Sequence, residues 1–245
     1  SADSAVARKA VSDVAVEFRN TTSDSSFVLG HNGTIDAAYK LKAMLPPTVA
    51  DTLLRLPIGS IIGPYIEGSE WKLAKIVDRK VIPDSVRARH ILIRDPQNPA
   101  SMATIDSLMG LIKSGKASFD SLAIKNSQDV GSGAKGGDLG WFPHASMVAE
   151  FNAVCFYTGE QGKLYKVATQ FGWHLIEITG KKFIKNEAGV KAAYISARIE
   201  PSKSTQQAAK DKAVALIQKG KTVTDLTTLG GQEGFLVQSS TPLKT

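Results

Sequence analysis

The stretch QFGWHLIEITGKK, residues 170–182, decides the fold that we expect for this chain. The chain already reads GSEWKLAKIVDRK at residues 68–80, with the same succession of a Trp, a polar residue, Leu-x-x-Ile and a final basic pair. Two such phrases predict two related β-strands. The later strand carries His174 after its Trp, whereas the earlier one carries Lys72, so a histidine is needed in one copy and not in the other.

Hydrophobic patterning around these phrases predicts an α+β protein. Alternation in VRARHILI from Val86 predicts a strand, and Ile105, Leu108, Met109 and Ile112 form a helical stripe that begins near the N-cap Ser101. A second helix is predicted at FDSLAIKN, a glycine-rich loop at 131–137, a strand at DLGWF, a helix at MVAEFNAVCF, and strands near 163–168 and 172–179. This order indicates an antiparallel sheet with surrounding helices.

Less regular segments flank this unit. Val6, Ala10, Val14 and Phe18 recur at helical spacing, so we expect an amphipathic helix at the start of the chain. Residues 46–67, rich in Pro and Gly, predict a short helix and turns ahead of the strand WKLAKIV.

The composition excludes several classes of protein. The chain has 245 residues, 42% of them hydrophobic, and its 30 basic residues are scattered despite a net charge of +7, so we expect no nucleic-acid partner. Its single cysteine, Cys155, excludes internal disulfides and is expected in the core. No apolar run approaches the length of a membrane span, and we expect the chain to be a piece of a longer protein.

Five phrases within residues 87–182 occur in the order and spacing of one family: RARHILI, FDSLAIKNSQD, KGGDLGWF, MVAEF and TQFGWHLIEI. This segment resembles a parvulin-type peptidyl-prolyl cis-trans isomerase, and it is most similar to bacterial envelope foldases of the PpiD and SurA type. The resemblance implies a domain at 86–183 with the order β-α-α-α-β-α-β-β and a four-stranded antiparallel sheet. It also implies isomerisation of X-Pro bonds without a metal or other cofactor.

The resemblance implies two groups of site residues. The first contains the paired histidines His90 and His174, with Asp129 at the family's Cys-or-Asp position and Thr169 as a supporting hydroxyl. The second is an apolar proline pocket that contains Leu139, Phe142, Met147 and Phe151.

These residue types also suit the reaction on physical grounds. An X-Pro bond isomerises over a barrier of about 18–20 kcal/mol because amide resonance must be broken, and no covalent bond has to break. An apolar slot can hold the pyrrolidine ring and remove water from the amide, and Met147 and Phe151 would share one helix face. We favour a structural, mutually hydrogen-bonded role for the two histidines because the reaction needs no net proton transfer.

Each residue has an ordinary alternative. A histidine in an apolar strand is usually a satisfied core residue, Asp129 could cap a helix or turn, and Met147 and Phe151 could be core. A two-His-one-carboxylate metal site from His90, His174 and Asp129 lacks a closely spaced ligand pair, so we expect no metal. His31 and His144 receive no role.

The segments on either side, 1–85 and 184–245, are predicted to be degenerate, non-catalytic parvulin-like half repeats. Lys72 replaces the equivalent of His174, Thr48 and Thr52 align with Met147 and Phe151, and Tyr194 falls where His90 would be. The alternative is that generic amphipathic strands and helices resemble one another.

We therefore expect an isomerase and foldase that acts on proline-containing, unfolded or extracytoplasmic polypeptides and is not phospho-specific. The flanks would bind clients or partner subunits, with oligomerisation left open, and we expect no membrane insertion of this piece itself. The expected location is the bacterial cell envelope or periplasm, as a soluble part of a membrane-anchored protein. The alternative from another class is a non-catalytic chaperone or scaffold that binds extended peptides.

Overall fold

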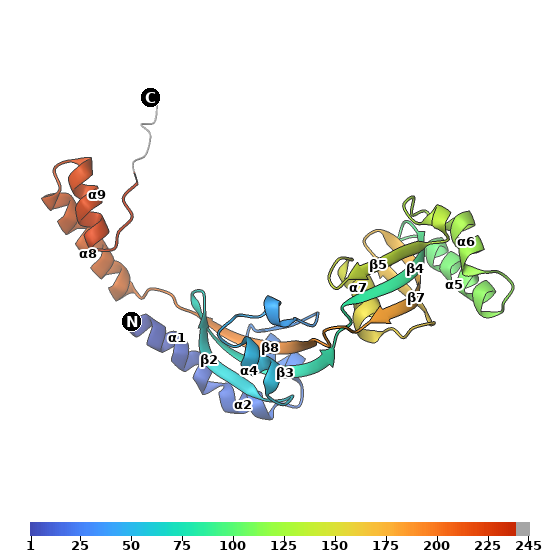
Figure 1. The fold of residues 1–245 in the computed structure, drawn as a ribbon. Helices are drawn as coiled ribbons and strands as arrows, with labels where there is room; N and C mark the ends of the chain where they lie inside the picture. Colours follow the sequence, from blue (N-terminus) through green and yellow to red (C-terminus); the bar gives the residue numbers. More distant parts are fainter. Residues whose placement is uncertain (239–245) are drawn as a thin grey trace. The chain divides into compact units, whose positions relative to one another are not determined.

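The structure is a computed structural model, and it describes residues 1–238. The chain divides into two compact units, one made of residues 1–14, 64–72 and the chain from 196 onward, the other of 15–63 and 73–195. The larger unit carries the predicted site. Figure 1 shows the ribbon of the chain, coloured along the sequence.

The sheet that carries the site has four strands in the order β5-β4-β7-β6. Its strands are β4 (Ser85–Ile93), β5 (Asp138–Pro143), β6 (Leu164–Thr169) and β7 (Gly172–Lys182), and every neighbouring pair is antiparallel. The α+β class, the antiparallel sheet and the strand that contains QFGWHLIEITGKK are thus confirmed. Because side chains alternate along a strand, β4 and β7 each present two different faces.

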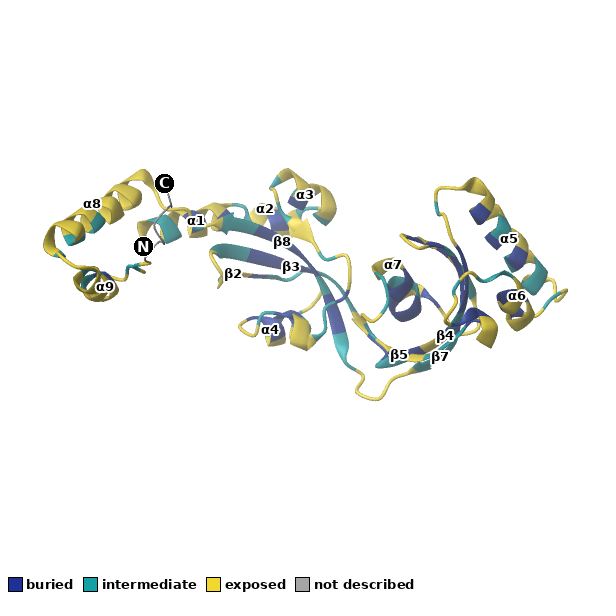
Figure 2. Cartoon of the chain, turned by 90° about the horizontal axis from the view of Figure 1, so that it is seen from above, coloured by how far each residue is buried: buried dark blue, intermediate teal, exposed yellow. Residues whose placement is uncertain are grey.

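Helices cover both faces of this sheet. On one face, α5 (Pro99–Lys113) and α6 (Phe119–Asn126) pack against Ile91, Ile93 and Leu175, and the short helix η2 (Gly133–Lys135) follows. On the other, α7 (Ala149–Asn152) and the π-helical turn η3 (Ala153–Thr158) pack against Val86, Ile176 and Ile178. Figure 2 shows α7 and the α5–α6 pair on opposite sides of β4 and β7.

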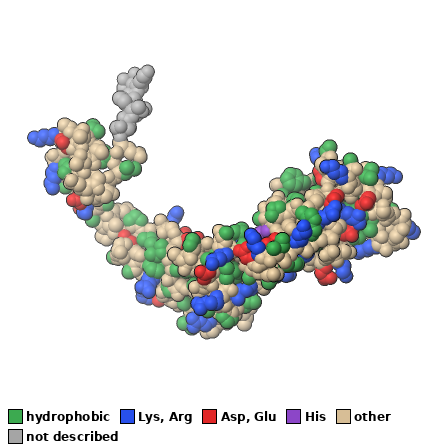
Figure 3. All heavy atoms as spheres, viewed as in Figure 1, with side chains coloured by type: hydrophobic (Ala, Val, Ile, Leu, Met, Phe, Trp, Pro, Cys, Tyr) green, Lys and Arg blue, Asp and Glu red, His purple; other side chains and the backbone are tan. Residues whose placement is uncertain are grey.

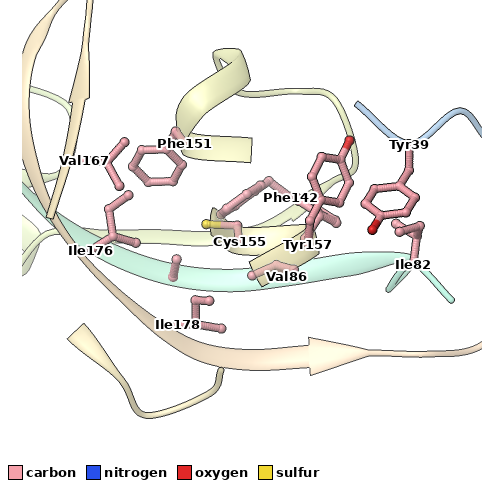
Figure 4. Packing of buried hydrophobic residues seen from close by; sticks show 12 residues of the cluster. Tyr39, Ile82, Val86, Phe142, Phe151, Cys155, Tyr157, Val167, Ile176 and Ile178 are labelled. Carbon is pink, nitrogen blue, oxygen red and sulfur yellow. The ribbon is translucent and has the colours of Figure 1, made fainter. Parts of the chain in front are cut away.

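The core under α7 is continuous and contains Cys155, as predicted. Figure 4 shows Phe151 beside Val167 and above Ile176, with Phe142 next to Tyr157. Burial raises the pKa of the Cys155 thiol to about 12, so this residue is a small core side chain and not a reactive thiolate.

The structure corrects some local predictions. Helix α5 begins after Asn98, whose side chain accepts from the Ala100 N–H, because Pro99 suits the first helical position; Ser101 is inside the helix. The predicted helix at MVAEFNAVCF is shorter and becomes a π turn. The predicted first helix breaks at Val14 into α1 (Ala2–Asp13) and α2 (Ala15–Asn20). Its buried residues are Ala7, Val11 and Phe18, while Val6 is exposed.

A second sheet, in the order β1-β8-β3-β2, is built from both flanks of the chain. It contains β1 (Thr34–Ile35), β2 (Ile61–Glu67), β3 (Glu70–Val81) and β8 (Ala188–Arg198). The strand predicted at WKLAKIV is confirmed, whereas β2 falls within residues 46–67, where a short helix and turns were predicted. The N-terminal flank also contains the helices α3 (Asp24–Gly30) and α4 (Ala50–Arg55) and the short helix η1 (Lys42–Met44).

The smaller unit contains α1, α8 (Lys203–Lys219) and α9 (Val223–Gln232). Trp71 donates its indole N–H to the Ser4 hydroxyl at 2.9 Å, and the Arg8 guanidinium lies over the Trp71 ring. In this copy of the repeated phrase the Trp therefore packs on a helix. Strand β8, from the C-terminal flank, pairs with β1 and β3, from the N-terminal flank, so the two flanks share one sheet. That the flanks are degenerate parvulin-like repeats stays a prediction.

Candidate functional site

His90 and His174 lie on neighbouring strands and face the α7 side of the sheet. In the register of β4 and β7, Leu92 stands opposite His174 and Ile176 opposite His90. The two histidines are thus diagonal neighbours, a separation that aromatic side chains can bridge. Their Nδ1 atoms lie 3.0 Å apart, and the side chains are only 6% and 4% exposed.

Both remaining ring nitrogens have partners. Nε2 of His90 lies 2.8 Å from Oδ2 of Asp129 and 3.1 Å from the Ser132 hydroxyl. Nε2 of His174 lies 2.8 Å from the Thr169 hydroxyl, which accepts from the Phe171 N–H at 3.1 Å. The structure therefore brings all four predicted polar residues into one network and adds Ser132.

The partners assign a direction to this network. An ionised carboxylate only accepts, so His90 donates from Nε2 to Asp129 and, when neutral, accepts at Nδ1. His174 then donates from Nδ1 to His90 and accepts at Nε2 from the Thr169 O–H. Every group has one consistent role, so each ring is held in a single tautomer and orientation.

The electrostatics of the site favour this neutral pair. Burial lowers the pKa of His90 despite the nearby Asp129 carboxylate, and burial, with the proximity of His90, lowers the pKa of His174 to about 4. Burial alone would raise the pKa of the Asp129 carboxyl, but hydrogen bonds from Ser132, His90 and the Gly131 N–H outweigh it and lower that pKa to about 2. At neutral pH the site holds two neutral imidazoles beside one carboxylate.

The glycine-rich loop at 131–137 brings Ser132 to the histidines. The His90 N–H donates to the Gly137 carbonyl at 2.9 Å, and the Gly137 N–H to the Ser132 carbonyl, also at 2.9 Å. Gly137 has a φ of 81°, and a Cβ there would lie 2.2 Å from the His90 carbonyl oxygen. Only glycine allows so close an approach.

Beside the histidines is a cleft of about 720 Å³. It is lined by His90, Leu92, Arg94, Asp129, Leu139, Ser146, Met147, Val148, Phe151, Gln170, Phe171 and His174. The Phe151 ring stands nearly perpendicular to both imidazoles, with centroid distances of 5.6 Å to His90 and 5.5 Å to His174. Three of the four predicted pocket residues thus line one cleft with both histidines.

The fourth, Phe142, is not among the lining residues. It is buried behind Phe151, with ring centroids 6.4 Å apart, and supports the cleft from below. Phe142 and Leu139 would point to opposite faces of a regular strand, yet both lie on the α7 side. The alternation is broken at Gly140, whose φ is 66°, where the register of β4 and β5 shifts between Arg87 and Arg89.

Several cleft residues were not identified from the sequence. Gln170 and Phe171 lie in the turn between β6 and β7, and Phe171 is 54% exposed at the cleft. Their positions directly before the GWH phrase were the available signal. Among the described residues, no group of three His, Cys, Asp or Glu side chains is placed to hold a metal ion.

The chain is similar in sequence to known proteins. Residues 71–182 match the family model described as the PPIC-type PPIase domain. Two relatives, both named Chaperone SurA, come from Pseudomonas syringae pv. tomato and Pseudomonas putida. The first is 32% identical over 158 residues, which are 60% of this chain and 36% of that protein. The second is 31% identical over 172 residues, 66% of this chain and 39% of that protein.

Among solved structures, the peptidylprolyl isomerase PrsA of Bacillus cereus is 35% identical, over 43% of this chain and 38% of that one, with a TM-score of 0.37. PrsA of Bacillus anthracis is 27% identical, over 65% of this chain and 64% of that one, with a TM-score of 0.38. The chain spans less than two fifths of the length of the two SurA relatives.

Proposed function

Because residues 71–182 match the PPIC-type PPIase domain, we propose that this protein catalyses cis-trans isomerisation of X-Pro bonds in unfolded or extended polypeptides. The observation that carries the proposal is the shared cleft of Met147, Phe151 and the neutral histidine pair. It combines an apolar surface for a pyrrolidine ring with polar groups whose positions are fixed in advance.

The hydrogen-bond network argues against acid–base chemistry by the histidines. All four ring nitrogens are engaged within the protein, so none is left to exchange a proton with a substrate. The pair instead keeps the floor of the cleft rigid, and its edges support Phe151. This is the structural role that we favoured from the reaction alone.

Catalysis then follows from the environment of the amide. Resonance gives the planar amide a large charge separation, which is lost when the C–N bond twists. An apolar cleft that removes water from the carbonyl oxygen therefore disfavours the planar forms more than the twisted one. Met147, Leu139 and Phe151 supply that surface, while Gln170 and Arg94 are placed to orient the flanking peptide.

The test is isomerisation of a short X-Pro peptide, followed by NMR exchange spectroscopy. Met147→Ala should lower kcat/KM by about tenfold, since it removes apolar area from a partly exposed wall. Phe151→Ala is a less clean probe because Phe151 is 3% exposed and part of the core, so we expect that variant to lose stability as well. Absence of turnover by the folded parent protein would refute the proposal.

We further propose that the protein acts as a chaperone for such polypeptides in the bacterial envelope. The support is the name of the SurA relatives and the apolar side chains exposed on the flanks. In the described part of the chain, no helix is long and apolar enough to cross a membrane. If the parent protein bound X-Pro peptides and suppressed aggregation without turnover, the non-catalytic alternative would stand.

A further inference from the structure

One wall of the cleft is formed by the segment 143–148. Met147 and Val148 pack against the core under α7, whereas Pro143, Ala145 and Ser146 are exposed. Ala145 adopts a φ of 64°, a left-handed conformation that is strained for a non-glycine residue. A contact outside the segment must stabilise this backbone.

The side chain of Asn152 makes that contact. It is 4% exposed, and its Oδ1 accepts from the Ala145 N–H at 2.8 Å. Its Nδ2 donates to the Tyr157 hydroxyl at 3.1 Å, so both ends of the amide are satisfied. A buried amide bonded at both ends has one orientation, and it fixes the residue two positions before Met147.

Tyr157 connects this amide to the beginning of the same segment. Its hydroxyl lies 2.6 Å from Nε2 of His144. Because the hydroxyl accepts from Asn152, its own proton is free to be donated to His144, which then accepts at Nε2. Burial lowers the pKa of His144, in agreement with this accepting, neutral imidazole. His144, which had no predicted role, thus anchors the segment next to Ala145.

The π turn makes the arrangement possible. Asn152 and Tyr157 are five residues apart, which in an α-helix would place them on different faces. The chain changes from α7 to η3 at Ala153, and the i→i+5 spacing of a π turn brings such residues together. The π turn therefore positions a hydrogen-bonded support under the cleft wall.

We propose that Asn152 is a positioning residue that sets the affinity of the cleft for proline by holding Met147 in place. This inference rests on the proposed function and deepens it. Asn152 is not one of the residues lining the cleft, so it acts through the segment 145–147. The chemistry assigned to the cleft itself is unchanged.

The experiment compares Asn152→Leu with a matched control in the full chain. Leucine has a similar size but removes both amide hydrogen bonds. The control is Asn126→Leu, since Asn126 is partly buried and donates to the backbone carbonyl of Leu122, away from the cleft. We expect Asn152→Leu to raise KM for an X-Pro peptide about fivefold or more while kcat changes less than about twofold, and Asn126→Leu to leave KM unchanged.

A double-mutant cycle tests the route through Met147. On a Met147→Ala background, Asn152→Leu should raise KM by less than about twofold further, because the group that it positions is already absent. Tyr157→Phe, which removes the hydroxyl that accepts from Asn152, should also raise KM. This variant replaces Asn152→Leu in the test if Asn152→Leu does not fold. Additive effects, or an unchanged KM in the folded Asn152→Leu or Tyr157→Phe protein, would overturn the proposal.

Two readouts do not depend on turnover. The ¹³C signal of the Met147 ε-methyl group, one of four methionines and assigned with Met147→Leu, should shift in Asn152→Leu but not in Asn126→Leu. The Kd for the X-Pro peptide should rise in parallel. If the parent protein binds the peptide without isomerising it, the proposed function fails, and these readouts still decide whether Asn152 positions Met147.

Discussion

Thr169 is the residue of the histidine network whose hydroxyl both accepts, from the Phe171 N–H, and donates, to His174. Thr169→Val keeps the shape but leaves Nε2 of His174 without its donor in a buried site. We expect the free energy of unfolding to fall by about 1–3 kcal/mol and kcat/KM to fall with it. Thr169→Ser keeps the hydroxyl and should retain most of both. Equal behaviour of the Val and Ser variants, in urea melts and peptide assays, would contradict the role of the Thr169 hydroxyl in the network.

The low pKa of His174 predicts how stability depends on pH. In the unfolded chain a histidine binds a proton below about pH 6.5, whereas folded His174 does so only near pH 4. Between these values the unfolded state holds more protons, so stability falls as the pH falls. The pKa difference corresponds to at most about 3 kcal/mol, fully present above pH 6.5 and lost by about pH 4. His90, whose pKa is also lowered, adds to the same trend.

Urea unfolding at a series of pH values checks this prediction. Carboxyl groups also titrate near the lower end of the range, and the low pKa of Asp129 contributes mainly between pH 3.8 and about 2. The informative quantity is therefore the difference between the parent and His174→Asn. We expect the variant to lose less stability between pH 7 and pH 4.5 than the parent, and parallel curves would refute the assignment.

The predicted polar residues that lie together in the structure are those that came from a recognisable phrase. His90, His174, Asp129 and Thr169 each lay within such a phrase, and the network unites them. Ser132 and Asn152 gave no comparable signal. Their contacts depend on backbone conformations that side-chain patterns do not reveal, a positive φ at Gly137 and a π turn after Asn152.

At the level of helices and strands, periodicity was most informative where one face is buried. VRARHILI alternates because β4 separates the α7 core from the α5–α6 core, and its prediction held. Strand β2, with Gly63 and Pro64 inside it, lacks that alternation and was missed. Phe142 was assigned to the proline pocket from the resemblance, whereas the structure places it against Phe151 and not among the residues that line the cleft.

The connection between β4 and α5 predicts the substrate preference. Arg94 is the one Lys or Arg among the lining residues of the cleft, and the next residue, Asp95, is acidic. The ionised Asp129 carboxylate on the same wall would repel a phosphate dianion. We therefore expect phospho-Ser-Pro peptides to be isomerised no faster than Ser-Pro peptides. A strong preference for the phosphorylated peptide that disappears in Arg94→Ala would contradict this.

For the whole molecule, the distribution of charge agrees with a polypeptide client better than with nucleic acid. On the face seen in Figure 3, basic side chains lie among acidic and apolar ones. Several of the basic groups are paired, as in Lys9–Asp13 and Arg87–Asp138. The flanks also expose large apolar side chains, including Val6, Leu29, Ile58, Ile217 and Leu236.

The last prediction separates the isomerase domain from its flanks. A fragment of residues 82–183 keeps the whole cleft and its network. It loses Tyr39, whose ring packs 4.9 Å from that of Tyr157, and the ammonium group of Lys80, which donates to the Tyr157 carbonyl. The lost contacts are with the ring and the backbone carbonyl of Tyr157, whereas its hydroxyl keeps the hydrogen bonds to Asn152 and His144. We therefore expect the fragment to fold with a lower Tm and to isomerise a short peptide within about twofold of the full chain.

The same fragment should be a poorer chaperone than the full chain. One proline cleft offers little contact area to a large unfolded client, whereas the flanks contribute the exposed apolar side chains. The comparison is suppression of aggregation at equal molar concentration, with peptide turnover measured on the same samples. Turnover retained with suppression lost would assign client binding to the flanks. Equal suppression by both would mean that the flanks serve only to complete the second sheet and to support Tyr157.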